Sequence, residues 1–175
     1  DLVLVQGDTS TALAASLCAF YSKVPIGHIE AGLRTGDNYA PWPEEGNRRL
    51  ISVVASLHFA PTESAQHNLL SEGISRDKIF VTGNTVVDTV QDIRDQFRGT
   101  DNLIAQYASK FSFLNPNSRW VLVTGHRRES FGPGIENICH AIKEIVKKHD
   151  DVEVIYPVHL NPKVRGVVYD ILGNS

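Results

Sequence analysis

The sequence comprises 175 residues, of which 42% are hydrophobic and 21% are charged, as in an ordinary globular chain. This composition excludes a disordered polymer and a coiled coil. The net charge is −3, so neither nucleic acid nor a membrane surface is expected as a partner, and no apolar run approaches the roughly 20 residues of a membrane span. Two cysteines are too few for a disulfide scaffold and favour a reducing, cytoplasmic setting.

Short apolar runs rich in β-branched residues alternate with longer segments of helical periodicity. This alternation predicts parallel α/β architecture, and the lack of polar alternation within the runs suits strands covered on both faces. The predicted strands are residues 2–5, 24–29, 57–60, 79–82, 120–124 and 152–158. Because the chain lacks Met and opens inside an apolar run, we expect it to be an internal piece of a longer protein.

Helices are expected between these strands. The first follows Asp8-Thr9-Ser10, residues suited to an N-cap, and the second starts near Pro43, which suits a first turn. The remaining helices are expected at about 62–73, 85–97, 135–149 and 162–173, and residues 103–111 have the pattern of a further short helix. The pattern weakens between Gly99 and Arg119, which predicts a domain connection there.

Three loops that follow predicted strands place glycine beside ionisable residues. They are residues 6–9, 30–35 and 125–130. In open α/β sheets, ligands bind beyond the carboxyl ends of the strands. We therefore expect these three loops to border one cleft.

The acidic candidates in these loops each allow two interpretations. Asp8 either caps the following helix or presents a carboxylate at the cleft floor. Glu30 ends an apolar run, where a partly desolvated carboxylate suits proton transfer, unless it pairs with Arg34. Glu44 and Glu45 start a helix and point about 100° apart, so at most one faces a ligand; for Glu45, compensation of the helix dipole is the favoured alternative.

The loop after residue 124 contains His126, Arg127 and Arg128, followed by Gly132-Pro133-Gly134 and a helix. Cations and flexible backbone N–H groups near a helix start predict an anion-binding site, for which a diphosphate is the expected ligand. The alternative is a solvated basic turn. His159 ends another predicted strand and is a candidate to join His126.

Neither a cofactor nor a metal is expected. The sequence contains no GxxxxGK[ST] or GxGxxG motif, which disfavours a P-loop NTPase or a nicotinamide enzyme. No pair of His or Cys residues has metal-ligand spacing.

Five strings together resemble the bacterial non-hydrolysing UDP-N-acetylglucosamine 2-epimerases. They are QGDT, HIEAGLRTGDNYAPWPEEGNRRL, FVTGNTVVDT, LVTGHRRESFGPGIENICHAI and VIYPVHLNP, and the resemblance runs across the whole chain. It implies two Rossmann-like domains of GT-B type, both incomplete in this chain. Residues 1–83 would be the C-terminal part of the first domain, 84–118 a helical connection, and 119–175 the first two strand-helix units of the second.

The resemblance also implies an activity and its residues. The family interconverts UDP-GlcNAc and UDP-ManNAc by eliminating UDP and adding it back with C2 inverted, which supplies ManNAc for surface polysaccharides. Asp8, Glu30 and Glu44 match the family's active-site carboxylates, and His126 matches its histidine near the diphosphate. Substrate contacts would come from Asp8, Glu30, His126 and Arg127, and a regulatory UDP-GlcNAc site in some members suggests roles for Glu45, Arg127 and His159.

Several alternatives and expectations accompany this resemblance. A hydrolysing 2-epimerase, a GT-B glycosyltransferase and a non-catalytic nucleotide-sugar sensor would each use a similar cleft. The full-length protein is expected to be a homodimer. Residues 1–175 alone are expected to be inactive, because the carboxylates and the diphosphate contacts belong to different, incomplete domains.

Overall fold

The computed structural model describes residues 1–98, 100–125 and 132–173. The chain divides into two compact units, Asp1–Gly99 and Thr100–Ser175, and the boundary falls inside the segment 84–118 that the sequence assigns to a connection. None of the helices in the described ranges is both long and apolar enough to cross a membrane.

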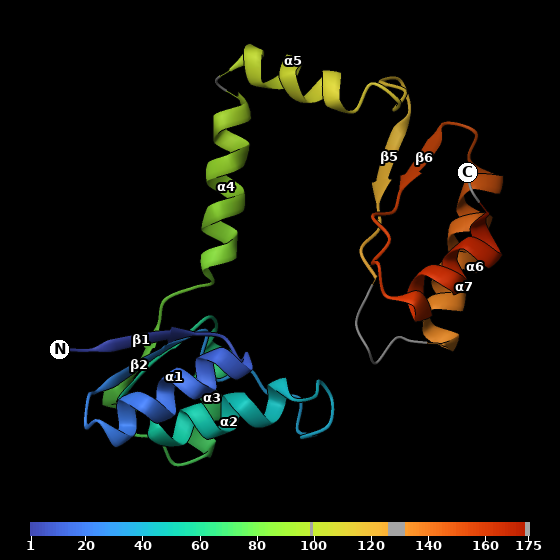
Figure 1. Cartoon of the computed structure of the whole chain (residues 1–175). Helices are drawn as coiled ribbons and strands as arrows, with labels where there is room; N and C mark the ends of the chain where they lie inside the picture. The colour runs from blue at the N-terminus through green and yellow to red at the C-terminus, as the bar shows by residue number, and fades with distance from the viewer. Residues whose placement is uncertain (99, 126–131, 174–175) are drawn as a thin grey trace. The chain divides into compact units, whose positions relative to one another are not determined.

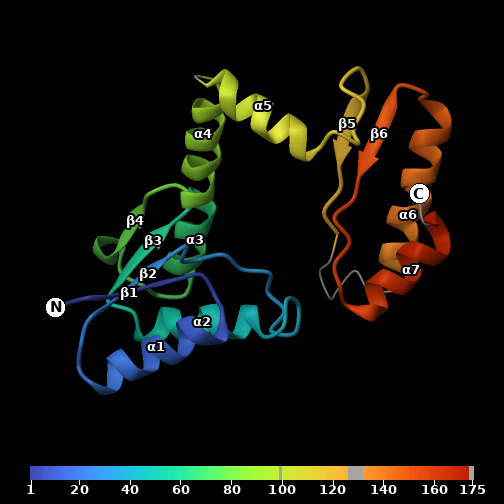
Figure 2. The same ribbon diagram turned by 45° about the horizontal axis from the view of Figure 1, so that its top comes forward.

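The first unit is built on a four-stranded parallel sheet whose strands lie in chain order (Figures 1 and 2). The strands are β1 (Val3–Gln6), β2 (Ile26–Ile29), β3 (Leu57–Ala60) and β4 (Ile79–Val81). The helices are α1 (Ser10–Tyr21), α2 (Glu44–Val54), α3 (Glu63–Ser71) and α4 (Thr85–Arg98), with the short 3-10 helix η1 (Arg76–Lys78) before β4. The parallel α/β architecture predicted from the sequence is confirmed in this unit.

One face of this sheet carries the core. Residues paired across parallel strands point to the same face, so Val5, His28, His58 and Ile79 form one row across β1 to β4. Val5 packs in a cluster with residues of α1 and α2, and Ile79 packs in a second cluster with residues of α3. The three helices therefore cover the face to which this row belongs, while Leu4 on the opposite face remains exposed.

The second unit pairs β5 (Arg119–Leu122) with β6 (Val152–Ile155) in parallel. Its helices are α5 (Asp101–Lys110), α6 (Pro133–Lys148) and α7 (Pro162–Leu172). Ile135 and Cys139 of α6 pack against Val164 and Val168 of α7, and all four are buried. Burial raises the pKa of the Cys139 thiol, so this cysteine acts as a small apolar core residue.

Four predicted strands are shorter in the structure. Those expected at 79–82 and 120–124 end at Val81 and Leu122, and the other two are shortened for local reasons. The strand expected at 24–29 begins at Ile26, because the Val24 N–H still donates to the Ala19 carbonyl at the end of α1. The strand expected at 152–158 ends at Ile155, two residues before Pro157, whose nitrogen has no hydrogen to donate to a sheet.

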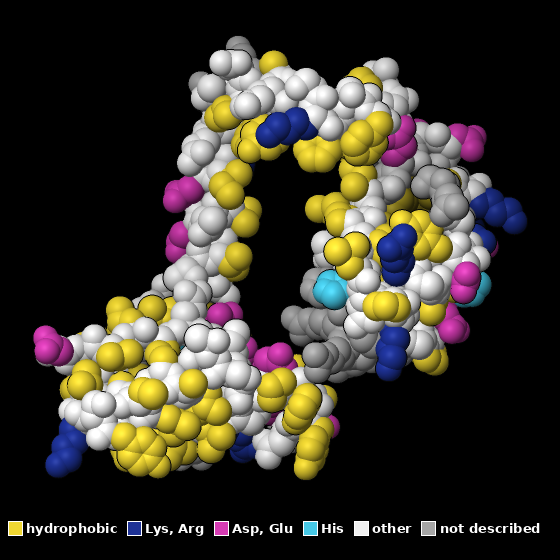
Figure 3. Space-filling model, in the orientation of Figure 1, with side chains coloured by type: hydrophobic (Ala, Val, Ile, Leu, Met, Phe, Trp, Pro, Cys, Tyr) yellow, Lys and Arg dark blue, Asp and Glu magenta, His cyan; other side chains and the backbone are white. Residues whose placement is uncertain are grey.

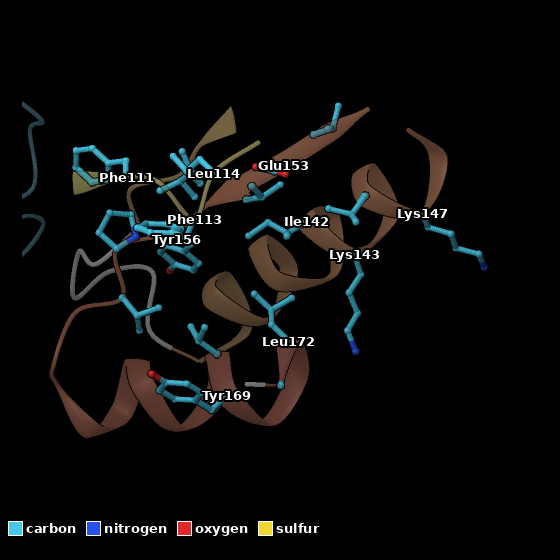
Figure 4. A pocket seen from close by; sticks show the side chains of 18 residues that line it. Phe111, Phe113, Leu114, Ile142, Lys143, Lys147, Glu153, Tyr156, Tyr169 and Leu172 are labelled. Atoms are coloured by element: carbon cyan, nitrogen blue, oxygen red, sulfur yellow. The ribbon is translucent and has the colours of Figure 1, made fainter. Parts of the chain in front are cut away.

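A large apolar hollow lies in the second unit, between β6, α6, α7 and the loop after α5 (Figure 4). Its volume is about 1000 Å³. Phe113 and Tyr156 both belong to its lining, and Lys143 and Lys147 extend away from it (Figure 4). Of the predicted site residues that the structure describes, none lines the hollow, and its apolar character does not suit a diphosphate.

Candidate active site

Two of the predicted carboxylates follow neighbouring strands. β1 and β2 pair in parallel with Gln6 opposite Ile29, so Asp8 and Glu30 both lie just beyond the carboxyl edge of the sheet. The Glu30 side chain reaches the turn before Asp8, because a Cβ added to Gly7 would lie 3.7 Å from Glu30 Oε2. The structure thus brings Glu30 beside the turn that carries Asp8.

The first turns of α2 hold Asp8 in two places. Arg48 Nη2 lies 2.9 Å from Asp8 Oδ2, and Asn47 Nδ2 donates to the Asp8 backbone carbonyl at 2.8 Å. The Asp8 side chain is 28% exposed and that of Arg48 only 10%. Sequence reasoning missed Asn47 and Arg48, although both lie one helical turn after Glu44 and therefore on its face of the helix.

Glu30 has a left-handed backbone conformation, with φ 66°, which is uncommon for a non-glycine residue and concentrates at functional sites. The segment after it is fixed by Arg34, which donates to both Glu72 carboxylate oxygens, at 2.8 and 2.7 Å, and to Ser52 Oγ at 3.0 Å. The alternative that Arg34 pairs with Glu30 is therefore wrong. The hydrogen bond from Arg34 also holds the pKa of Glu72 below its ordinary value.

Glu44 and Glu45 differ in their surroundings, as expected for adjacent helical residues. Glu45 is fully buried, and its carboxylate accepts from the N–H groups of Thr35 and Gly36 at 3.2 and 3.3 Å and lies 3.6 Å from Arg48 Nε. Glu44 is only half-buried and lies one turn before Arg48, on the face of α2 that meets Asp8. Helical spacing thus places Glu44 on the side of α2 that carries Arg48, and Glu45 anchors the loop.

The candidates in the second unit are described only in part. His126 and Arg127 lie outside the described residues. Gly125 precedes them in the chain, and its carbonyl accepts from the Tyr156 hydroxyl at 2.9 Å. His159 follows β6, is exposed, and accepts a backbone N–H at its Nδ1 at 3.1 Å. Tyr156, which sequence reasoning also missed, thus ties the start of the predicted anion loop to the end of β6.

Two neighbouring histidines lie on the inner face of the sheet below the carboxylates. His28 and His58 are 0% and 1% exposed, and they face each other across β2 and β3. Burial lowers the pKa of His28, and burial together with the neighbouring His28 lowers the pKa of His58 to about 4. Both rings are therefore neutral near pH 7.

The cluster is suited to acid-base chemistry on a polar ligand. Asp8, Glu30 and Glu44 provide carboxylates that can give or accept a proton, and Arg48 balances the charge of Asp8. Fixed partners hold the Asp8 turn and the segment after Glu30, which is the condition for precise proton transfer. We expect a ligand to enter at this strand end.

Comparison with known proteins gives a consistent result. The family model described as UDP-N-acetylglucosamine 2-epimerase matches residues 1–175. The chain belongs to the UDP-N-acetylglucosamine 2-epimerase family. The UDP-N-acetylglucosamine 2-epimerase of Escherichia coli strain K12 is 54% identical over 174 residues, which are 99% of this chain and 46% of that protein.

Solved structures of the epimerase family agree with this assignment. The Neisseria meningitidis UDP-GlcNAc 2-epimerase bound to UDP-GlcNAc superposes with a TM-score of 0.93 at 50% identity, and the match covers 99% of this chain and 46% of that one. The Methanocaldococcus jannaschii UDP-GlcNAc 2-epimerase in complex with UDP-GlcNAc and UDP gives 0.76 at 37% identity, over 99% and 45%. The chain therefore spans slightly less than half the length of these relatives.

Proposed function

We propose that the protein to which this chain belongs epimerises UDP-GlcNAc at C2 to UDP-ManNAc, reversibly and with UDP as the departing group. The observation that carries the proposal is the proximity of two carboxylate residues beyond the ends of β1 and β2, where the Glu30 side chain reaches the turn before Asp8. Two relatives support the ligand class, because their structures are described as bound to UDP-GlcNAc or to UDP-GlcNAc and UDP.

The chemistry explains why several carboxylates are needed. The C2 hydrogen of the sugar is not acidic, so the reaction proceeds by elimination: the C2–H bond and the C1–O bond to UDP break, and a C1–C2 double bond forms. UDP then adds back at C1 while a proton reaches C2 from the opposite face. Asp8, Glu30 and Glu44 are the groups that we assign to these proton transfers.

Charge on the departing diphosphate must also be stabilised. We assign this role to His126 and Arg127, on the loop that follows β5. An imidazolium can protonate the leaving oxygen, and a guanidinium can bind phosphate oxygens at two points.

Product analysis separates this function from its alternatives. The test uses the long form, meaning a polypeptide of the relatives' full length that carries residues 1–175 unchanged. Incubated with UDP-GlcNAc and followed by ¹H and ³¹P NMR, the long form is expected to give UDP-ManNAc with the sugar still attached to UDP. Free ManNAc would indicate a hydrolysing epimerase, transfer to an added acceptor would indicate a glycosyltransferase, and an unchanged substrate that binds would indicate a sensor.

A regulatory UDP-GlcNAc site that involves Glu45, Arg127 and His159 is a second proposal. Glu45 would act in it through the loop that it holds at Thr35 and Gly36. The reverse reaction of the long form is expected to need added UDP-GlcNAc. Full turnover of UDP-ManNAc from the first moment would contradict this site.

We also propose a cytoplasmic homodimer that supplies ManNAc units for surface polysaccharides. Hydrophobic side chains gather over α1 and α2 on the face drawn in Figure 3, and these two helices carry the exposed side chains Phe20, Tyr21, Leu50 and Val53. α1 carries no charged residue, so the same helix of a second copy can approach it without repulsion. Sedimentation is expected to give the mass of a dimer for the long form and the mass of a monomer for its Val53→Asp variant. Equal masses for the two proteins would contradict this interface.

A further inference from the structure

The turn between β1 and α1 is held to the sheet at a single residue, Gly7. Gly7 has φ 72°, and its N–H donates to the Ile29 carbonyl at 3.0 Å. Its carbonyl oxygen lies 2.8 Å from Nε2 of His28. This carbonyl belongs to the peptide that links Gly7 to Asp8, so the orientation of that peptide sets the direction in which the Asp8 residue leaves the sheet.

Hydrogen-bond chemistry determines which atom of His28 carries the proton. A carbonyl oxygen only accepts, so Nε2 must be the donor. Nδ1 is buried and has no hydrogen-bond partner among the residues that the structure describes, which fits a ring nitrogen without a proton. The charged groups that act on this ring are Arg34, Asp8 and Arg48.

The position of His28 makes it a rigid donor. It is fully buried in β2, the second strand of the sheet, between Val5 of β1 and His58 of β3. Glycine has no Cβ to restrict its backbone, so the Gly7 carbonyl depends on this bond for its direction. The other contacts of Asp8, from Asn47 and Arg48, come from α2 rather than from the sheet.

We propose that His28 is a positioning residue for Asp8: as a neutral ring protonated at Nε2, it fixes the Gly7–Asp8 peptide and thereby holds the Asp8 carboxylate at the substrate. The inference rests on the proposed epimerase function. His28 itself touches no reacting atom. Its contribution is to keep Asp8 in register with Glu30, where a displacement of about 1 Å can reduce the rate about 100-fold.

Two amide substitutions test this role in the long form. His28→Gln keeps a donor at about the distance of Nε2, whereas His28→Asn is too short to reach the Gly7 carbonyl. His28→Asn is expected to lower kcat about 10- to 100-fold with KM changed less than about 2-fold, because the substrate still binds but Asp8 is misplaced. His28→Gln is expected to restore kcat to within about 3-fold of the unchanged protein.

His58 offers a matched control. It is a buried histidine in the adjacent strand, and no hydrogen bond from it to the Gly7–Asp8 turn is found within the described ranges. His58→Asn is expected to lower the melting temperature as His28→Asn does and to leave kcat unchanged. Equal losses of kcat in the two Asn variants, or no rescue by His28→Gln, would show that His28 is merely structural and overturn the proposal.

A readout without activity covers the case in which the variants do not fold. In ¹⁵N NMR spectra of the unchanged long form at pH 7, His28 is expected to be protonated at Nε2 and unprotonated at Nδ1. The other tautomer, or an imidazolium, would overturn the proposal even in an active epimerase. Absence of epimerisation by the unchanged protein would instead refute the proposed function without altering this spectrum.

Discussion

Gly32 is the tightest point of the segment that carries Glu30, and its replacement by Ala should be costly. The residue has φ 89°, and a Cβ added there would lie 2.3 Å from the Ala65 carbonyl oxygen and 2.9 Å from Leu69 Cγ. The oxygen belongs to the backbone of α3, so it cannot move aside as a flexible side chain would. Gly32→Ala must therefore either displace α3 or shift the segment that follows Glu30.

The expected loss of stability is the sum of two separate free-energy costs. A left-handed backbone costs a non-glycine residue about 1–2 kcal/mol, and overpacking a well-packed core costs about 1–3 kcal/mol. Gly32→Ala is therefore expected to lower the free energy of unfolding by about 2–5 kcal/mol. Gly36 provides the matched control, because its φ is 83° and a Cβ there meets nothing within 4 Å, so Gly36→Ala carries only the first term.

Thermal unfolding of the long form, followed by circular dichroism, measures the difference. Gly32→Ala is expected to unfold at a clearly lower temperature than Gly36→Ala, and to lose activity because Glu30 moves with the segment. Equal melting temperatures for the two variants would refute the argument that close packing against α3 fixes this segment.

Three further predictions concern turnover, acid stability and the isolated chain. Glu30→Gln is expected to lower kcat of the long form by at least about 100-fold while calorimetry shows UDP-GlcNAc binding nearly unchanged, because the shape of the side chain is kept and the proton-transfer group is lost. Glu63→Gln, at an exposed position, serves as control, and equal kcat values for the two variants would contradict a role of Glu30 in proton transfer. His58 has a pKa of about 4 in the folded protein and about 6.5 when unfolded, so the unfolded chain binds the extra proton and the free energy of unfolding should fall by up to about 3 kcal/mol as the pH drops from 6.5 to 4. Urea unfolding of His58→Gln should show a shallower fall of this free energy with pH, and an identical fall would be inconsistent with a buried neutral ring. Purified residues 1–175 alone are expected not to interconvert UDP-GlcNAc and UDP-ManNAc, and measurable NMR conversion by them would show that the rest of the long form is dispensable.

The placement of Asp8 and Glu30 at neighbouring strand ends could be predicted because its signals are local. Asp8 and Glu30 each follow an apolar run, and parallel strands bring their carboxyl ends to one edge of a sheet. Glu44 could be separated from Glu45 by the 100° turn between adjacent helical residues. The structure leaves Glu44 half-buried and buries Glu45 completely.

The supporting contacts could not be predicted, because they depend on tertiary pairing. Arg34 binds Glu72, which lies 38 positions later in the chain, and no sequence pattern connects the two. His28 and His58 stand inside apolar strands, where only the strand register reveals that they are neighbours and that His28 reaches Gly7. The structure also shows that His58 is buried.

The most direct test of the proposed mechanism is exchange of the C2 hydrogen with solvent. The long form is incubated with UDP-GlcNAc in deuterated water until the two epimers reach equilibrium, and the sugars are examined by ¹H NMR and mass spectrometry. Because one carboxylate removes the C2 proton and another group delivers a proton from the opposite face, deuterium is expected at C2 of both UDP-GlcNAc and UDP-ManNAc. Formation of UDP-ManNAc that keeps its original C2 hydrogen would contradict elimination and re-addition by this carboxylate cluster.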